Sequence, residues 1–434
     1  MKIELVPMRS YGDKPREFLQ KVPSGLLPAI EVEGKIITES GVIMELLDKW
    51  RTAEEGYKEM MPRTNDIAAN QRYTQLAKLE RELFSWWCTL VFRPESSSFM
   101  NPFAKNSEMS SSMRGFFDCI QKVNVELNKE SGPWFFGDKD HPTMIDFIYV
   151  SHVERMLASV AFWKGLDMRD PKWGLNGIND WLEAFERRES YLAFKSDYFT
   201  HVMDIPPQYG PGYDGGFEED RIKFANSIIG RVSKGNIFNL CESFLFNTCP
   251  LPSQDGSWTL PLSFDDPLQP LYNGPPLPLA VLESMGLAAN AKGSYDDADP
   301  VIMEKACRYM AAWKLAGNGV NVSRFASRGG PKGAKNPRKS FGAQLADPYA
   351  DPDDVVRPFV DAALRVVCLA LLDDDANTHG DTLISAVPKG QAEGVISSLA
   401  YLRDRTGVPR DLPLASARYL RAYLNWGIDL LAAL

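Results

Sequence analysis

The sequence contains few of the residues that build metal sites and disulfide frameworks. Four histidines and six cysteines occur among 434 residues, and no two cysteines form a C-x-x-C pair. Such sparse cysteine is typical of a reducing compartment and indicates neither a zinc site nor a set of disulfides. We therefore expect a protein that carries no metal.

Long apolar runs and an excess of positive charge are also missing. No run approaches the roughly 20 apolar residues that a membrane-spanning helix needs, so no transmembrane segment is expected. The formal net charge of -9 argues against nucleic acid as a partner, because phosphates call for a basic surface. Hydrophobic residues make up 44% and charged residues 24%, which is the composition of a soluble globular protein.

The stretch from Lys14 to Ser40 is the most informative part of the chain. Pro15 suits the first position of a short helix, and a Pro-Ser-Gly turn ends that helix. Two alternating segments, residues 28–32 and 35–38, then predict two strands joined by a turn at residues 33–34. Pro28 opens the first strand, where proline does not interrupt the ladder. The pair Glu39-Ser40 closes the second strand and begins another helix.

This order of elements resembles the second half of the thioredoxin-like domain of glutathione S-transferases, in particular the plant-type and omega-like branches. The resemblance implies that Pro28 is a cis-proline and that the backbone of Leu27 pairs with the cysteinyl backbone of glutathione. It further implies that Glu39 and Ser40 hold the γ-glutamyl end and that Lys14 holds the glycyl carboxylate. The alternative is that Glu39-Ser40 only starts a helix.

The resemblance also implies that the family's first strand and helix, which carry the catalytic Cys, Ser or Tyr, are absent. We therefore expect an N-terminally truncated domain in which no catalytic residue can be assigned. In the family the missing strand lies within the sheet, so the strand expected at residues 2–6 should be displaced or pair with another segment.

Residues 64–201 predict a helical domain like the second domain of the same family. Thr143 and Asp146 have the spacing of a capping box, in which each side chain bonds to the other residue's backbone. By resemblance, the electrophilic co-substrate binds where this domain faces the glutathione site, and its first long helix supplies the candidates. The candidates by position there are aromatic, with a structural role in the core as the alternative: Tyr73, Phe84, Trp86 and Trp87.

The C-terminal half lies beyond the resemblance. A Gly-, Pro- and Tyr-rich stretch after residue 206 predicts a linker. Apolar residues at helical spacing then predict four helices, near residues 299–315, 354–372, 389–403 and 413–433. Between the first two helices, residues 323–340 hold six basic side chains and no acid, and we predict a flexible loop there: Arg324, Arg328, Lys332, Lys335, Arg338 and Lys339. This loop either binds an acidic partner, a phosphate or an anionic lipid, or is neutralised by the aspartates that follow it.

Together these patterns predict a mainly α protein with a partial α/β thioredoxin-like domain. The predicted domains are a partial thioredoxin-like domain (1–52), an all-helical domain (60–205), a linker (206–220) and a further, mostly helical domain (221–434). By resemblance, the function is to bind glutathione and to transfer it to, or reduce, a small hydrophobic electrophile. The alternative is a catalytically silent scaffold that uses its C-terminal half for a protein partner. A homodimer, a photosynthetic eukaryote as source and a plastid or cytoplasmic location also follow from the resemblance alone.

Overall fold

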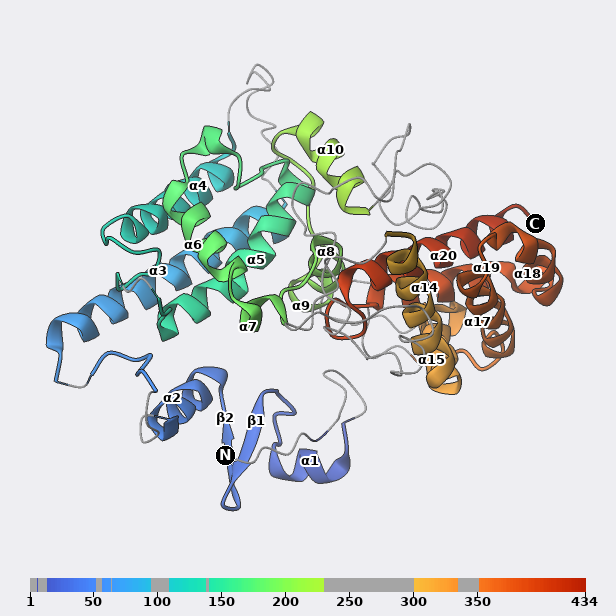
Figure 1. Ribbon diagram of the computed structural model, residues 1–434, viewed down its shortest axis with the longest axis horizontal. Coiled ribbons are helices and arrows are strands. Elements are labelled where there is room, and N and C mark those ends of the chain that lie inside the picture. Colours follow the sequence, from blue (N-terminus) through green and yellow to red (C-terminus); the bar gives the residue numbers. More distant parts are fainter. Residues whose placement is uncertain are drawn as a thin grey trace. The chain divides into compact units, whose positions relative to one another are not determined.

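The computed structural model describes residues 6, 14–51, 57–63, 65–94, 109–137, 140–229, 300–334 and 351–434. It is mainly helical, with one small sheet near the N-terminus (Figure 1), which confirms the predicted fold class. The expected strand at residues 2–6 lies almost wholly outside the described residues. Among the described residues, no helix is long and apolar enough to cross a membrane.

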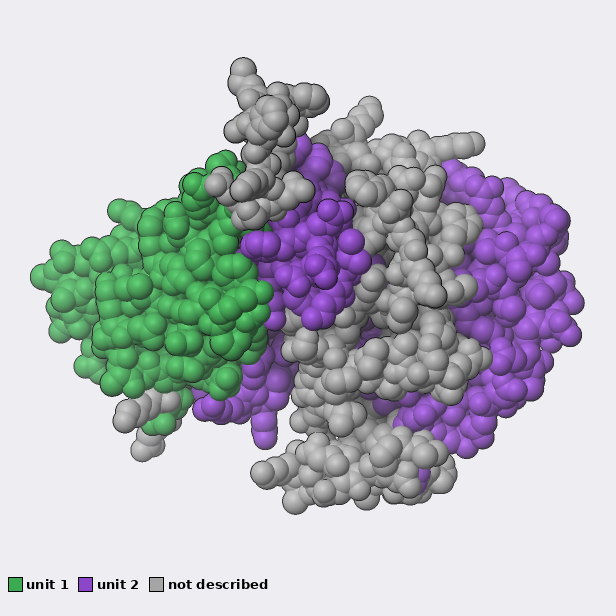
Figure 2. Space-filling view, turned by 90° about the horizontal axis from the view of Figure 1, so that it is seen from above, with its two compact units in different colours: residues 1–90, 109–153, 169–184 green, residues 91–108, 154–168, 185–434 purple. Residues whose placement is uncertain are grey.

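The chain forms two compact units, coloured separately in Figure 2. The first unit comprises residues 1–90, 109–153 and 169–184, and the second comprises residues 91–108, 154–168 and 185–434. The helices α3 and α5 contribute residues to both units.

The first unit begins with a helix and a hairpin. Helix α1 (Arg16–Lys21) precedes strands β1 (Ala29–Val32) and β2 (Lys35–Thr38), which pair in antiparallel fashion with Ala29 opposite Thr38. Glu33 and Gly34 both have positive φ, 48° and 77°, which gives a two-residue hairpin turn its correct twist. Helix α2 (Ser40–Arg51) follows. The predicted helix and strands are therefore confirmed.

The helical part of the first unit is built around a shared apolar face. Its helices are α3 (Ile67–Phe92), α4 (Ser111–Leu127), the first half of α5 (Met144–Lys164), the short η1 (Pro171–Trp173) and most of α6 (Asn176–Glu186). Helix α3 buries Leu76, Leu83 and Leu90, which recur at seven-residue steps on one face. Helix α4 starts where the Ser110 hydroxyl accepts the Met113 N–H at 3.2 Å.

The second unit adds short helices and a C-terminal bundle. The first group is α7 (Glu189–Leu192), α8 (Tyr198–Asp204), α9 (Pro206–Tyr209) and α10 (Glu218–Ile229). The bundle contains α14 (Pro300–Gly317), α15 (Gly319–Ala326), η3 (Ser327–Gly329), α16 (Pro331–Ala334) and α17 (Arg357–Leu372), then η4 (Ala376–His379), α18 (Gly380–Ala386), η5 (Lys389–Gln391), α19 (Ala392–Arg405) and α20 (Leu414–Ala432). The four helices predicted in the C-terminal half are therefore confirmed.

The region predicted to be a linker is held closely within the second unit. The Tyr213 N–H donates to the Val91 carbonyl at 2.9 Å, and the Gly215 N–H donates to the Trp163 carbonyl at 3.0 Å. A Cβ atom on Gly212 would lie 2.2 Å from Cε2 of the Trp163 indole. Gly212 therefore lets the backbone approach the Trp163 indole closely, which is a packing role that the linker prediction did not include.

The basic segment was predicted to be a flexible loop, and for residues 323–334 this prediction is wrong. These residues belong to α15, η3 and α16 and the turn between them, and Arg328 is only 7% exposed. A Cβ atom on Gly329 would lie 2.4 Å from the Ser397 carbonyl oxygen, so this glycine serves close packing against α19. Asp353 accepts the Lys332 N–H at 3.0 Å, which ties the segment to the start of α17. The other basic residues, Lys335, Arg338 and Lys339, lie outside the described residues.

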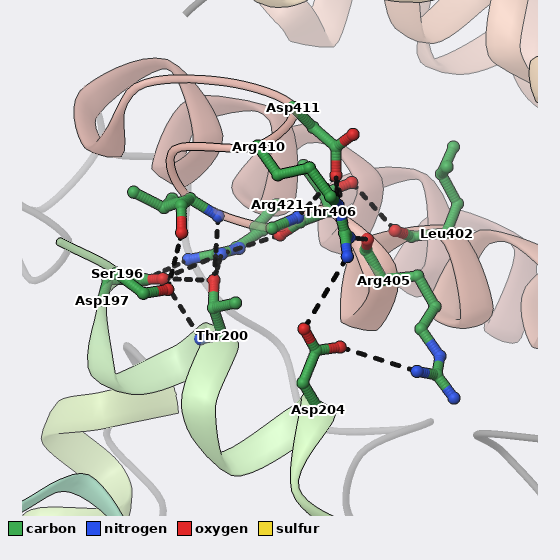
Figure 3. A network of polar contacts seen from close by, with 12 residues as sticks. Ser196, Asp197, Thr200, Asp204, Leu402, Arg405, Thr406, Arg410, Asp411 and Arg421 are labelled. Atoms are coloured by element: carbon green, nitrogen blue, oxygen red, sulfur yellow. Dashed lines mark hydrogen bonds and ion pairs between the residues drawn. The ribbon is translucent and has the colours of Figure 1, made fainter. Parts of the chain in front are cut away.

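A buried polar network joins α8 to the end of the chain (Figure 3). The Arg421 guanidinium of α20 donates to Asp197 at 2.6 Å and to the Thr200 hydroxyl at 3.0 Å. Its Nη2 also donates to the Thr406 carbonyl at 2.9 Å. Arg421 and Asp197 are each 2% exposed. Because an unpaired charge in such surroundings is costly, this ion pair fixes α8 against the C-terminal bundle.

Candidate glutathione site

The Leu27–Pro28 peptide bond, at the entrance to β1, is cis, as the resemblance implies. Leu27 is 42% exposed and the preceding Leu26 is 64% exposed. The N–H and C=O of Leu27 make no hydrogen bond to another described residue. This exposed edge therefore offers one donor and one acceptor to a peptide that lies alongside it.

The start of α2 lies directly after the hairpin. Glu39 has a positive φ of 72°, and Ser40 is the first residue of α2. Both side chains are exposed, and the Glu39 carbonyl accepts the Ile43 N–H at 3.0 Å. The first N–H groups of a helix have no partner within it and carry partial positive charge, so this end suits a carboxylate.

Lys14 closes the turn before the hairpin. Its ammonium donates to the Gly25 carbonyl at 2.5 Å. Gly25 has a positive φ of 64°, which the turn between α1 and β1 requires. The structure therefore places Lys14 beside the turn that leads to Leu27, and shows it holding the backbone there.

Comparison with known proteins agrees with this geometry. Residues 1–50 match the N-terminal domain of glutathione S-transferases. The chain is also similar to glutathione S-transferase DHAR2 of Arabidopsis thaliana, with 21% identity over 187 residues, which cover 43% of this chain and 73% of that protein. Both comparisons therefore point to the glutathione S-transferase family. This similarity supports a glutathione-related transferase function.

The second marker of the glutathione transferase fold, Thr143 and Asp146, is a buried capping site at the start of α5. The Asp146 carboxylate accepts the backbone N–H of Thr143 at 2.8 Å and its hydroxyl at 2.7 Å. The Thr143 hydroxyl thus donates to the carboxylate, whereas a full capping box would have it accept the Asp146 N–H. Asp146 also accepts the Phe135 N–H at 3.2 Å and the Trp181 indole N–H at 2.9 Å. Burial raises the pKa of Asp146, while these four hydrogen bonds oppose that shift.

Two of the four co-substrate candidates on α3, Trp86 and Trp87, pack against other parts of the protein. Trp87 has no exposed surface and lies in the core, as the alternative to a co-substrate role expects. Trp86 packs over Gly115 of α4, where a Cβ atom would lie 2.4 Å from the indole. Trp87 is therefore not placed to meet a small molecule from solvent, whereas Trp86 is partly exposed.

The other two candidates, Tyr73 and Phe84, are partly exposed, and the Phe84 ring packs against Trp87 with 5.5 Å between the ring centroids. Burial, and then the charge of Glu45 on α2, raise the pKa of Tyr73. The Phe84 ring lies 5.0 Å from the His152 imidazole, centroid to centroid. A groove lies along the first half of α3, and neither Tyr73 nor Phe84 lines it. Its lining residues are Ile67, Asn70, Gln71, Thr74, Gln75 and Lys78.

The thiols for which the structure shows a shifted pKa are poor nucleophiles. Burial raises the pKa of Cys119 and of Cys307 to about 12, and that of Cys368 to about 11. These three side chains are therefore protonated at neutral pH, and the thiol form is unreactive. Within the described parts of the chain, no group of three or more His, Cys, Asp or Glu side chains is arranged to hold a metal ion.

The sequence reasoning missed one ionisable pair. Glu80 is 2% exposed, and its Oε1 lies 2.6 Å from Nδ1 of His152 on α5. The available signal was the position of Glu80 on the apolar face of α3, four residues after Leu76. A carboxylate is rarely buried without a partner, so this position required one.

Proposed function

We propose that the cis-proline edge at Leu27 and the start of α2 bind glutathione, and that the protein transfers it to, or uses it to reduce, a small hydrophobic electrophile. The observation that carries this proposal is that an unpartnered backbone edge at Leu27 and an exposed helix N-terminus at Ser40 lie at the two ends of one hairpin. The edge suits the peptide backbone of glutathione, and the helix start suits its γ-glutamyl carboxylate.

Titration calorimetry with reduced glutathione tests the binding step. The Ser40→Ala variant should bind about 10- to 150-fold more weakly, since a hydrogen bond to a charged group contributes about 1.5–3 kcal/mol. The exposed Ser151 hydroxyl lies on α5 and bonds to the Ile148 carbonyl at 3.1 Å, so Ser151→Ala provides a matched control with unchanged affinity. Absence of heat with the unaltered protein, or equal affinity of both variants, would rule out this site.

The alternative function is a glutathione transferase fold that acts as a scaffold without catalysis. It is favoured by large exposed apolar side chains in the C-terminal bundle, at Trp313 of α14 and at Leu369 and Leu372 of α17. Exposed tryptophan side chains are enriched among the residues that carry the binding energy of protein interfaces. An assay of glutathione conjugation separates the two functions: turnover of an electrophile by the unaltered protein supports the enzyme, and glutathione binding without turnover supports the scaffold.

A further inference from the structure

The short helix α7 lies in a stretch of chain that buries none of its side chains. Residues 186–196 are all exposed or half-buried, and Phe194 is 81% exposed. The helices on either side are packed into the core instead, because α6 buries Phe185 and α8 buries Tyr198 and Phe199. Helix α7 has a single turn and no side-chain cap at its N-terminus. Local opening of such a segment costs little free energy, since it exposes little apolar surface.

Tyr191 connects α7 to the interior of the second unit. Its ring lies 5.1 Å from the Phe185 ring of α6, centroid to centroid. Its hydroxyl donates to the carboxylate of Glu154 on α5, and this hydrogen bond favours the ionised carboxylate. The Glu154 side chain is only 15% exposed. The α7 segment, which we define as residues 187–196, therefore lies against a carboxyl group that has little access to water.

The groups around Glu154 compensate its negative charge only in part. On α8, Nε2 of His201 lies 4.0 Å from Oε2 of Glu154, and burial lowers the pKa of His201 to about 3, so this imidazole is neutral above that pH. The cations of Arg155 and Lys195 favour an ionised carboxylate. Glu186 of α6 opposes them, both by its own charge and because it pairs with Lys195 at 3.3 Å. Burial has the largest effect, and it raises the pKa of Glu154 to about 7.

We propose that the α7 segment is a pH-sensitive switch, which packs against Glu154 while that carboxyl is protonated and opens locally as the carboxyl ionises. In the closed segment an ionised Glu154 is largely cut off from water, whereas opening hydrates it. Opening releases Tyr191 from the Phe185 ring. Helix α8 stays in place, because Arg421 donates to its N-cap residue Asp197 at 2.6 Å (Figure 3). The α7 segment shares no residue with the proposed glutathione site, so the two proposals are independent.

The direction and size of the effect follow from the pKa of Glu154 in the closed and open states. The pKa is about 7 in the closed state, and the ordinary value of a hydrated glutamate is 4.5. Because the closed state binds the proton more tightly, its stability is fully present below pH 4.5 and is lost as the pH rises through 7. Between about pH 5 and pH 8 the equilibrium constant for opening should rise by up to about 70-fold. At higher pH it should level off, because Glu154 is then ionised in both states.

Hydrogen exchange on the full chain between about pH 5 and pH 8 tests the switch. The reporters are the backbone N–H groups of Leu192, Ala193 and Lys195, which donate to carbonyls within the α7 segment. Their protection factors, which are corrected for the intrinsic pH dependence of exchange, should fall by up to about 70-fold in the unaltered protein. Glu154→Gln can still accept the Tyr191 hydrogen bond but does not titrate, so its protection factors should stay constant.

Two controls show whether the change belongs to Glu154 and to α7 alone. Glu189→Gln removes an exposed carboxylate from the same helix, and its α7 amides should still lose protection as the pH rises. The N–H groups of His201 and Ile205 report on α8, and their protection should not follow that of α7. A fall in α7 protection that is at least about threefold larger in the unaltered protein than in Glu154→Gln supports the switch. A smaller difference would overturn the inference, and so would an equal fall at α8.

Discussion

The variant Glu154→Gln should change how the stability of this protein depends on pH. Glu154 lies on α5, and the Tyr191 hydroxyl of α7 donates to its carboxylate. Burial raises the pKa of Glu154 to about 7, although Tyr191, Lys195 and Arg155 act in the opposite direction. The glutamine side chain has nearly the same shape and can still accept the Tyr191 hydrogen bond, but it does not titrate.

The magnitude follows from the difference between the folded and unfolded pKa values. The ordinary value for Glu154 is 4.5 and the folded value is about 7, and each unit of difference corresponds to about 1.36 kcal/mol. A raised pKa means that the folded state holds the proton more tightly than the unfolded state. The contribution is therefore fully present below pH 4.5 and is lost as the pH rises through 7. Glu154 alone should lower the free energy of unfolding by about 3 kcal/mol across this range.

Urea unfolding at a series of pH values measures this effect as a difference between the two proteins. The stability of Glu154→Gln relative to the unaltered protein should increase by about 3 kcal/mol between about pH 4.5 and pH 8. Burial lowers the pKa of the nearby His201 to about 3, but this titration occurs in both proteins and cancels in the difference. Glu189 of α7 is exposed, so Glu189→Gln provides the matched control for the loss of one carboxylate. A constant offset between Glu154→Gln and the unaltered protein at all pH values would refute this reasoning.

Two further variants test the packing of the second unit. Arg421→Met should lower the free energy of unfolding by about 3–5 kcal/mol because it leaves the buried Asp197 carboxylate without its cation. The same change at the exposed Arg365, which pairs with Asp361 on α17, should cost less than about 1 kcal/mol, and equal losses would contradict the role of the network. Gly212→Ala should lower stability by about 1–3 kcal/mol because the new methyl group would collide with the Trp163 indole. An unchanged melting temperature for Gly212→Ala would show that this segment moves away easily.

The local elements of the first unit could be predicted from the sequence because their signals are local. Pro28 and the pair Glu33-Gly34 mark the start of β1 and the turn to β2, and the structure has both. A turn depends on the φ values of two residues, and those follow from the residues themselves. The helices of the C-terminal bundle were predicted for a similar reason, since their apolar residues recur at helical steps.

Residues 323–334 were wrongly predicted to form a flexible loop, because the glycine content of this basic segment was taken as a sign of flexibility. A glycine such as Gly329 is compatible with a flexible loop and equally with a close contact between helices, so the sequence alone does not separate the two. Only the tertiary structure shows that the Ser397 carbonyl lies where a side chain would be. The same holds for Gly212, whose neighbour Trp163 lies about 50 residues earlier in the sequence.

The sequence by itself determined the N-terminal hairpin and the four long helices of the C-terminal half, because short-range sterics and periodicity fix those features. The tertiary structure decided which charged side chains are buried and with whom. Glu80 is adjacent to His152, and Asp197 is adjacent to Arg421, although 72 and 224 residues separate the partners along the chain. The ionisation of a buried carboxylate depends on burial and on its neighbours in space. The buried ion pairs and the pH-sensitive Glu154 therefore became visible only once the helices were packed.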